Sequence, residues 1–200
     1  MNPTPEPVRE RPNFLAWTAS ILVISALLYW GNYEWRRFRI RQNEHEAYQA
    51  MMLLNSAEWD YRAKDRDGNH VEDFWTGDVA GLLKFGMIPR ELAEADLAPL
   101  QALVPKPIPY HGYYFKVLIA DNFETPPVAY RQETDKTSGK VHHLTKFGFV
   151  AIPADRGTSG KRFYVVNENN TIFPTIENMP AAPVDWPTDE ELKMYYSKIQ

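Results

Sequence analysis

The sequence predicts an α+β protein in which a long N-terminal helix packs on a small antiparallel sheet. Residues 13–64 contain no proline and carry apolar side chains at spacings of three and four, which is typical of a helix. Beyond residue 110, short segments rich in aromatic and β-branched residues alternate with turn-forming residues, as strands and loops do. A helix followed by consecutive strands is the order of an α+β fold.

The first part of the predicted helix is apolar enough to enter a membrane. Residues 12–33 carry no formal charge, and about 20 helical residues cross a hydrocarbon core about 30 Å thick. The Leu, Ile, Val and Phe side chains between Phe14 and Trp30 together favour insertion by about 2–5 kcal/mol. We therefore expect a transmembrane helix over residues 13–33. A buried core helix is the alternative, although such helices seldom stay charge-free for so long.

Four segments follow from this pattern. Residues 1–12 are expected to be a disordered, proline-rich tail, and residues 13–33 the transmembrane helix. Residues 34–64 form an amphipathic helical arm, and residues 65–200 a globular α+β head. We expect the apolar stripe of the arm to pack on the head's own sheet, while packing against neighbouring copies stays open. The stripe consists of Ala47, Ala50, Leu54, Ala57 and Tyr61.

The charges around the apolar run bear on which side the head occupies. Four arginines follow the run and two precede it, so the positive-inside rule taken literally places the head in the cytoplasm. That rule weakens when a long domain follows the span. No small-residue cleavage site follows the run, so we expect an uncleaved signal anchor with the head outside the cytoplasmic membrane.

Composition limits the functions of the chain. A formal charge of −4 provides no broad basic surface, so nucleic acid is not an expected partner. The chain has no cysteine, which excludes thiol catalysis and disulfides. Because no motif pairs a nucleophile with a base, we expect no enzyme and no organic cofactor.

The head is expected to contain a mainly antiparallel sheet of three or four strands and two short helices. The strands lie at residues 112–119, 146–152, 162–167 and 171–173, and residues 121–145 form a long loop or loose hairpin. A helix is expected at residues 90–100. A second runs through residue 198 from the capping box of Thr188 and Glu191.

One acidic segment is a candidate metal site. Residues 65–73, DRDGNHVED, place carboxylate and amide oxygens where a tight loop could direct them at Ca²⁺. His70 stands where an EF-hand loop has glycine, and Thr76 where it has a bidentate glutamate. A solvated turn after the helix is the alternative. The candidate Ca²⁺ ligands are Asp65, Asp67, Asn69 and Asp73.

Two further patterns, a histidine pair and a group of aromatic residues, are weaker candidates for binding sites. His142 and His143 point to opposite faces of an extended segment, so a histidine metal site is not expected. Several aromatic side chains could stack on sugars if exposed, although core packing is their usual role. They are Tyr110, Tyr113, Tyr114, Phe115, Phe74 and Trp75.

The layout resembles that of type IV pilin-like and pseudopilin-like proteins, with an apolar helix, an amphipathic continuation and a trailing antiparallel sheet. Residues 41–82 are similar to the arm of pseudopilins, and HGYYFKVL with FGFVAIPADRGTSGKRFYVVNENNTIF is similar to the sheet of an uncharacterised bacterial family. The sequence lacks the glycine that precedes the apolar run of matured pilins, and Thr18 replaces their glutamate. The resemblance therefore implies pilin-like architecture and leaves assembly into a pilus open.

We expect a single-pass, non-catalytic structural or interaction subunit in the bacterial inner membrane. Its expected partners are the lipid bilayer and, as candidates, its own copies or other pilin-like subunits. The alternative is a monomeric membrane-tethered module that binds Ca²⁺ or a glycan.

Overall fold

A computed structural model describes residues 14–101, 106–137 and 139–196, with side chains from Trp17 onward. The predicted disordered tail, residues 1–12, lies outside the described residues. The chain divides into two units, residues 1–38 and residues 39–200. Helix α1, Phe14–Lys64, contributes its first part to one unit and its second part to the other.

The first unit presents apolar side chains on all sides of α1. Their exposed fractions lie between 51% and 77%. In the part of the chain that the structure describes, no helix combines the length and the apolarity that a membrane crossing needs. The exposed side chains are Trp17, Ile21, Leu22, Val23, Ile24, Leu27, Leu28, Tyr29, Trp30, Tyr33, Trp35 and Phe38.

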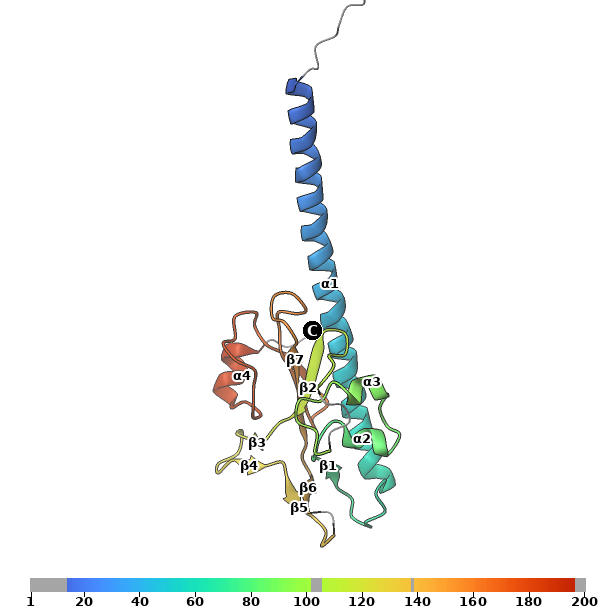
Figure 1. Cartoon of the computed structure of the whole chain (residues 1–200). Helices are drawn as coiled ribbons and strands as arrows, with labels where there is room; N and C mark the ends of the chain where they lie inside the picture. Colours follow the sequence, from blue (N-terminus) through green and yellow to red (C-terminus); the bar gives the residue numbers. More distant parts are fainter. Residues whose placement is uncertain (1–13, 102–105, 138, 197–200) are drawn as a thin grey trace, which may run out of the picture. The chain divides into compact units, whose positions relative to one another are not determined.

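The second unit is built on a four-stranded antiparallel sheet of order β2-β7-β8-β9. Strand β2 is Tyr113–Val117, β7 is Gly148–Pro153, β8 is Tyr164–Asn167 and β9 is Ile172–Pro174. Each lies at one of the positions that the sequence predicts (Figure 1).

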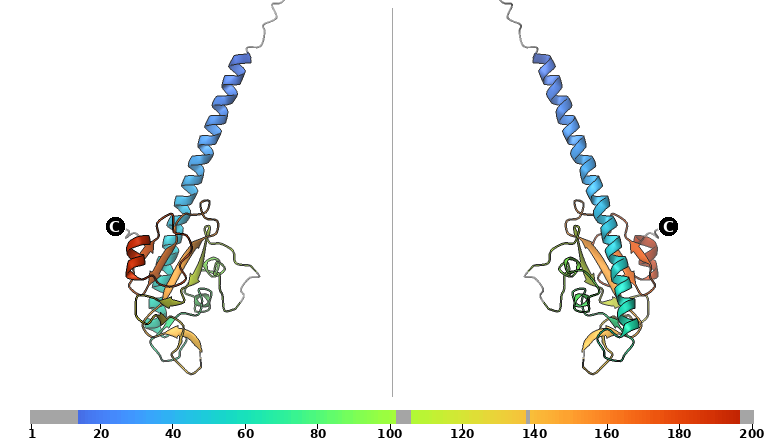
Figure 2. Two further views of the ribbon diagram at one scale, coloured as in Figure 1. Left: turned by 90° about the vertical axis from the view of Figure 1, so that its left-hand side faces the viewer. Right: turned by 90° about the vertical axis from the view of Figure 1, so that its right-hand side faces the viewer.

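Helices cover both faces of this sheet. Alternate residues along its strands point to opposite sides, so each face packs against a different helix. Phe115 and Phe149 pack against the buried stripe of α1. Val150 and Val165 pack on the other face against Trp186 and the chain around α4, Asp189–Tyr195. Figures 1 and 2 show α1 and α4 on opposite sides of the sheet.

The predicted stripe of α1 is confirmed as the packing face. Its five residues, Ala47, Ala50, Leu54, Ala57 and Tyr61, are at most 4% exposed. The predicted class is likewise confirmed, since a long N-terminal helix packs on antiparallel sheets.

Two smaller sheets extend the second unit. Strands β1, Phe74–Trp75, and β5, Gln132–Glu133, flank β6, Lys140–His143, in the order β1-β6-β5. Strands β3, Ala120–Asp121, and β4, Val128–Ala129, form a pair. The loose hairpin is thus the better of the two predictions for residues 121–145, because β5 and β6 pair antiparallel.

The short helices differ in part from prediction. Helix α2 is Gly81–Lys84 and α3 is Arg90–Ala93, which is shorter than the predicted helix over residues 90–100. The backbone leaves the helix because Leu97 N donates to Phe115 O at 2.9 Å. The predicted capping box is confirmed, because Thr188 and Glu191 bond reciprocally. The predicted end at residue 198 is wrong, because α4 ends at Tyr195 and the extended Tyr196 pairs with Thr175 instead.

Candidate metal centre

The turn after α1 directs Asp67 towards the head. The helix ends at Lys64, and both Asp65 (φ 44°) and Gly68 (φ 68°) adopt the left-handed conformation. Glycine adopts this conformation without the steric cost of a Cβ atom. The Gly68 N–H donates to Asp65 O at 3.0 Å and closes the turn. The Asp67 side chain is consequently only 14% exposed.

His142 occupies the central strand of the three-stranded sheet. It pairs with Trp75 of β1 on one side and Gln132 of β5 on the other, and its side chain is 1% exposed. The neighbouring His143 ring has different contacts, because its Nδ1 accepts hydrogen bonds from Thr145 N and Lys146 N. The predicted divergence of the two histidines is therefore confirmed.

Three carboxylates surround the His142 ring. Asp73 Oδ2 lies 3.2 Å and Asp135 Oδ2 3.7 Å from Nδ1, while Asp67 Oδ2 lies 3.6 Å from Nε2. They come from the turn after α1, the residue before β1 and the segment after β5. We call Asp67, Asp73, Asp135 and His142 the carboxylate–histidine cluster.

Neighbouring side chains hold the cluster in place. Thr134 Oγ1 donates a hydrogen bond to Asp73 and lies 3.2 Å from His142 Nδ1. Asn69 Nδ2 donates to Asp135 Oδ2 at 2.9 Å. The Tyr61 hydroxyl of α1 lies 3.5 Å from His142 Nε2. The cluster therefore joins the end of α1 to the β5–β6 hairpin.

Burial and charge shift the titration of the groups inside the cluster. Burial alone lowers the pKa of His142, but the hydrogen bond with Asp73 and the three carboxylates outweigh it and raise the pKa overall. Burial also raises the pKa of Tyr61, and the Asp67 contact adds to this rise. The pKa of nearby Glu58 lies well above its usual value because the carboxyl is buried, although the hydrogen bond from Trp75 N opposes the rise.

Negative charge exceeds positive charge at this position. Among the described residues, no lysine or arginine forms an ion pair with Asp67 or Asp73. Asp67 Oδ2 and Asp73 Oδ1 are buried, and no donor in the described part of the chain forms a hydrogen bond with either atom. Buried carboxylate oxygens without donors are unfavourable. A bound cation would compensate both the charge and the empty acceptor positions.

The geometry fits a metal ion. One donor atom from each of Asp67, Asp135 and His142 lies within 4.8 Å of the other two. Carboxylate oxygen and imidazole nitrogen are both ligands of divalent metals. Asp73 then occupies the position of the carboxylate that orients a metal-bound histidine through its other ring nitrogen.

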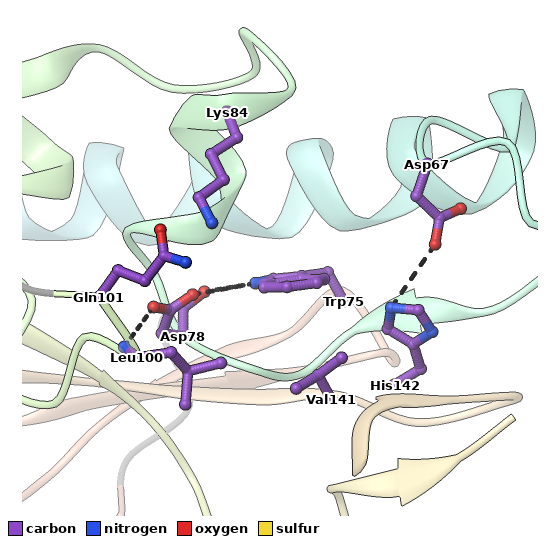
Figure 3. A pocket seen from close by; sticks show the side chains of 8 residues that line it. All are labelled: Asp67, Trp75, Asp78, Lys84, Leu100, Gln101, Val141 and His142. Carbon is purple, nitrogen blue, oxygen red and sulfur yellow. Dashed lines mark hydrogen bonds and ion pairs between the residues drawn. The ribbon is translucent and has the colours of Figure 1, made fainter. Parts of the chain in front are cut away.

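A pocket of about 350 Å³ opens beside the cluster. Asp67 and His142 line one end, and Figure 3 shows Lys84 and Gln101 on the far side of the Trp75 ring. Trp75 Nε1 donates to the backbone oxygen of Asp78 at 2.8 Å, which fixes the indole between the two ends. A small molecule in this pocket would lie against the ring and reach the cluster.

Three of the four predicted Ca²⁺ ligands lie in or beside the cluster. Asp67 and Asp73 belong to it, and Asn69 contacts it through its amide nitrogen, because Asn69 Oδ1 accepts from Val71 N. The Asp65 carboxylate instead accepts from His70 N.

Sequence reasoning did not consider Asp135 and set His142 aside as a metal ligand, whereas the structure groups both with Asp67. Both lie more than 60 residues downstream of the acidic turn, in a segment predicted to be a loop or loose hairpin. The pairing of β6 with β1 brings them to the turn, and no local pattern in the sequence indicates that pairing.

The aromatic residues considered for glycan stacking are mostly core residues. Phe74, Tyr113 and Phe115 are fully buried, and Tyr110, Tyr114 and Trp75 are half-buried. Trp75 is the aromatic residue of this set that lines the pocket beside the cluster.

Fold and site together define an α+β protein with a helix-capped antiparallel sheet and a buried carboxylate–histidine cluster. The chain belongs to the family described as Protein of unknown function (DUF2950), whose profile matches residues 26–175. No curated protein and no solved structure matches the chain.

Proposed function

We propose that the chain is a single-pass, membrane-anchored, pilin-like interaction subunit of the bacterial cell envelope, without catalysis. The observation that carries this proposal is the first unit, a helix with large apolar side chains exposed on every side. A helix that is apolar all round belongs in a protein core or in a membrane.

Insertion energies support the anchor. The apolar side chains of the charge-free run favour insertion by about 2–5 kcal/mol in sum. The structure describes side chains from Trp17 onward, whereas the proposed span begins at Asn13. Arg36, Arg37, Arg39 and Arg41 follow the run, where they can contact lipid phosphates. In this proposal the head lies on the outer side of the inner membrane.

The second part of α1 offers a surface for a protein partner. The buried stripe faces the sheet of the same chain, but Met52, Leu53 and Trp59 remain 46%, 38% and 38% exposed. Exposed apolar side chains on one helix are suited to contact with another copy or a similar subunit.

Fractionation tests the anchor. We expect the full chain in the membrane pellet after an alkaline wash, with release by detergent. Ile24→Asp should move the chain to the soluble fraction, because a central aspartate costs about 3–4 kcal/mol relative to isoleucine. Met52→Asp, in the second unit, is the matched control and should stay in the pellet. Recovery of the unaltered chain without detergent would refute the anchor.

Photo-crosslinking tests the partner surface. A crosslinking residue at Met52 or Trp59 should yield adducts with the chain itself or with another small membrane protein. The same residue at Met194, which is 63% exposed on α4, is the control and should yield none. Equal adducts at both positions would argue against the proposed surface.

The second candidate is a membrane-tethered binding module that holds a cation, with Ca²⁺ as the ion that the sequence favours. The convergence of Asp67, Asn69 and Asp73 supports it, because these residues fold against Asp135 rather than into solvent. A rise in Tm with saturating Ca²⁺ that is lost in Asp67→Ala and Asp73→Ala would support the calcium form. A Tm that does not respond to Ca²⁺ would refute it.

A further inference from the structure

We propose that the carboxylate–histidine cluster binds a first-row transition-metal dication such as Mn²⁺ or Zn²⁺ in preference to Ca²⁺, with Asp67, Asp135 and His142 as ligands. This inference rests on the binding-module candidate and specifies its ion. It adds two ligands that lie outside the acidic turn, Asp135 and His142.

The donor set carries the choice of ion. Ca²⁺ takes six to eight oxygen ligands. Here the converging set contains an imidazole, while Asn69 Oδ1 is already bonded to Val71 N and the Asp65 carboxylate to His70 N. Imidazole with carboxylate suits Mn²⁺, Fe²⁺ and Zn²⁺.

The contacts of His142 also match those of a metal-bound histidine. Asp73 Oδ2 lies 3.2 Å from Nδ1, so a proton on Nδ1 leaves the Nε2 lone pair for the ion. Nε2 and Asp67 Oδ2 are 3.6 Å apart. Neighbouring ligands in a tetrahedral site with bonds of about 2.0–2.1 Å lie about 3.4 Å apart, so this separation needs little adjustment.

A second observation points to a ligand independently of the donor set. Asp73 is 0% exposed at its side chain, yet among the residues that the structure describes its Oδ1 has no hydrogen-bond donor, and neither has the buried Asp67 Oδ2. Buried polar atoms in folded proteins normally have partners. An ion held by Asp67 and His142 would bring positive charge close to both carboxylates, because Asp73 lies against the other nitrogen of the same ring.

The proposed ion would remain accessible. Asp67 and His142 both line the pocket of about 350 Å³, and three protein ligands leave further coordination positions. Bound there, the ion would join the turn after α1 to the β5–β6 hairpin, so its removal should loosen the hairpin.

The test measures thermal unfolding of the full chain in detergent after chelation, with MnCl₂, ZnCl₂, CaCl₂ or MgCl₂ added. At 100 times its Kd, an ion bound to the folded state raises Tm by about 5–10 °C in a chain of this size. We expect such a shift with Mn²⁺ or Zn²⁺ and a smaller one with Ca²⁺ or Mg²⁺.

Matched variants locate the site. His142→Ala and Asp67→Asn should raise the Kd of the effective ion at least about tenfold. His143→Ala removes an adjacent buried histidine outside the cluster, and His70→Ala removes a surface imidazole, so both should keep the shift. If His142→Ala does not fold, Asp67→Asn decides, because asparagine keeps the oxygen that accepts the Asn69 N–H.

Three results would overturn the proposal. They are a Ca²⁺ shift as large as that of Mn²⁺ and Zn²⁺, an undiminished Mn²⁺ or Zn²⁺ shift in Asp67→Asn, and no shift with any ion. A chain that binds Ca²⁺ best would still be a cation-binding module. A chain that binds Zn²⁺ but is soluble without detergent would refute the membrane anchor alone.

Discussion

Asp96 provides a sharp test of the energetics of the head. It is 2% exposed, and its carboxylate accepts hydrogen bonds from Ala80 N at 2.9 Å and Ala98 N at 2.8 Å. Burial raises its pKa to about 6, because the two hydrogen bonds do not offset the loss of solvation and Asp78 adds negative charge nearby. The change to test is Asp96→Asn, which cannot ionise.

The sign of the effect follows from proton linkage. The folded state binds the Asp96 proton more tightly than the unfolded chain, whose carboxyl has an ordinary pKa near 3.8. The contribution to stability is therefore greatest below that value and is lost as the pH rises through about 6. A difference of about two pKa units corresponds to about 3 kcal/mol. Most of this, about 2–3 kcal/mol, falls between pH 4 and 7.5.

Urea unfolding of both proteins across this pH range measures the effect. The amide loses one acceptor for the two N–H groups, so Asp96→Asn has a cost that does not vary with pH. The stability of the variant relative to the unaltered chain should then improve by about 2–3 kcal/mol from pH 4 to 7.5. Glu190→Gln, at an exposed position of α4, is the control and should give a profile parallel to that of the unaltered chain. A pH-independent difference for Asp96→Asn would refute the reasoning.

Other substitutions test the core, the cluster and the last helix. Leu54→Ala, at a fully buried position, should cost about 3 kcal/mol in chemical unfolding, whereas Leu53→Ala, at a neighbouring position 38% exposed, should cost less than about 1. Glu58→Gln should be more stable relative to the unaltered chain at pH 8 than at pH 5, because the buried carboxyl has a raised pKa; equal values would contradict this. Thr188→Ala should cost about 1 kcal/mol by removing the cap of α4, and a negligible loss would mean that α4 adds little to global stability.

If the proposed anchor and the proposed ion site both hold, ion binding at the cluster would couple to the packing of α1. The turn that carries Asp67 follows directly on α1, and α1 also supplies Tyr61 to the cluster and Leu54 to the core. An ion at the cluster would stabilise the packing of this part of α1 on the head. Its effect on partner binding can be measured by repeating the crosslinking at Met52 with and without chelator.

The sequence alone determines the features that depend on local pattern. The spacing of Leu54 and Tyr61 predicts the buried face of α1, because one side of a helix repeats every 3.6 residues. The aromatic and β-branched run at 113–117 predicts a strand, and Thr188 with Glu191 predicts a capped helix start. Each of these signals lies within a few residues of the structure that it specifies.

Only the tertiary structure decides the candidate metal centre. Asp67 and His142 are 75 positions apart, and they meet because β6 pairs with β1 directly after the acidic turn. Strands of two to four residues have too little periodicity to predict that pairing. The burial of Glu58 and Asp96 is likewise decided by tertiary structure. Their carboxylates accept hydrogen bonds from backbone N–H groups of other segments.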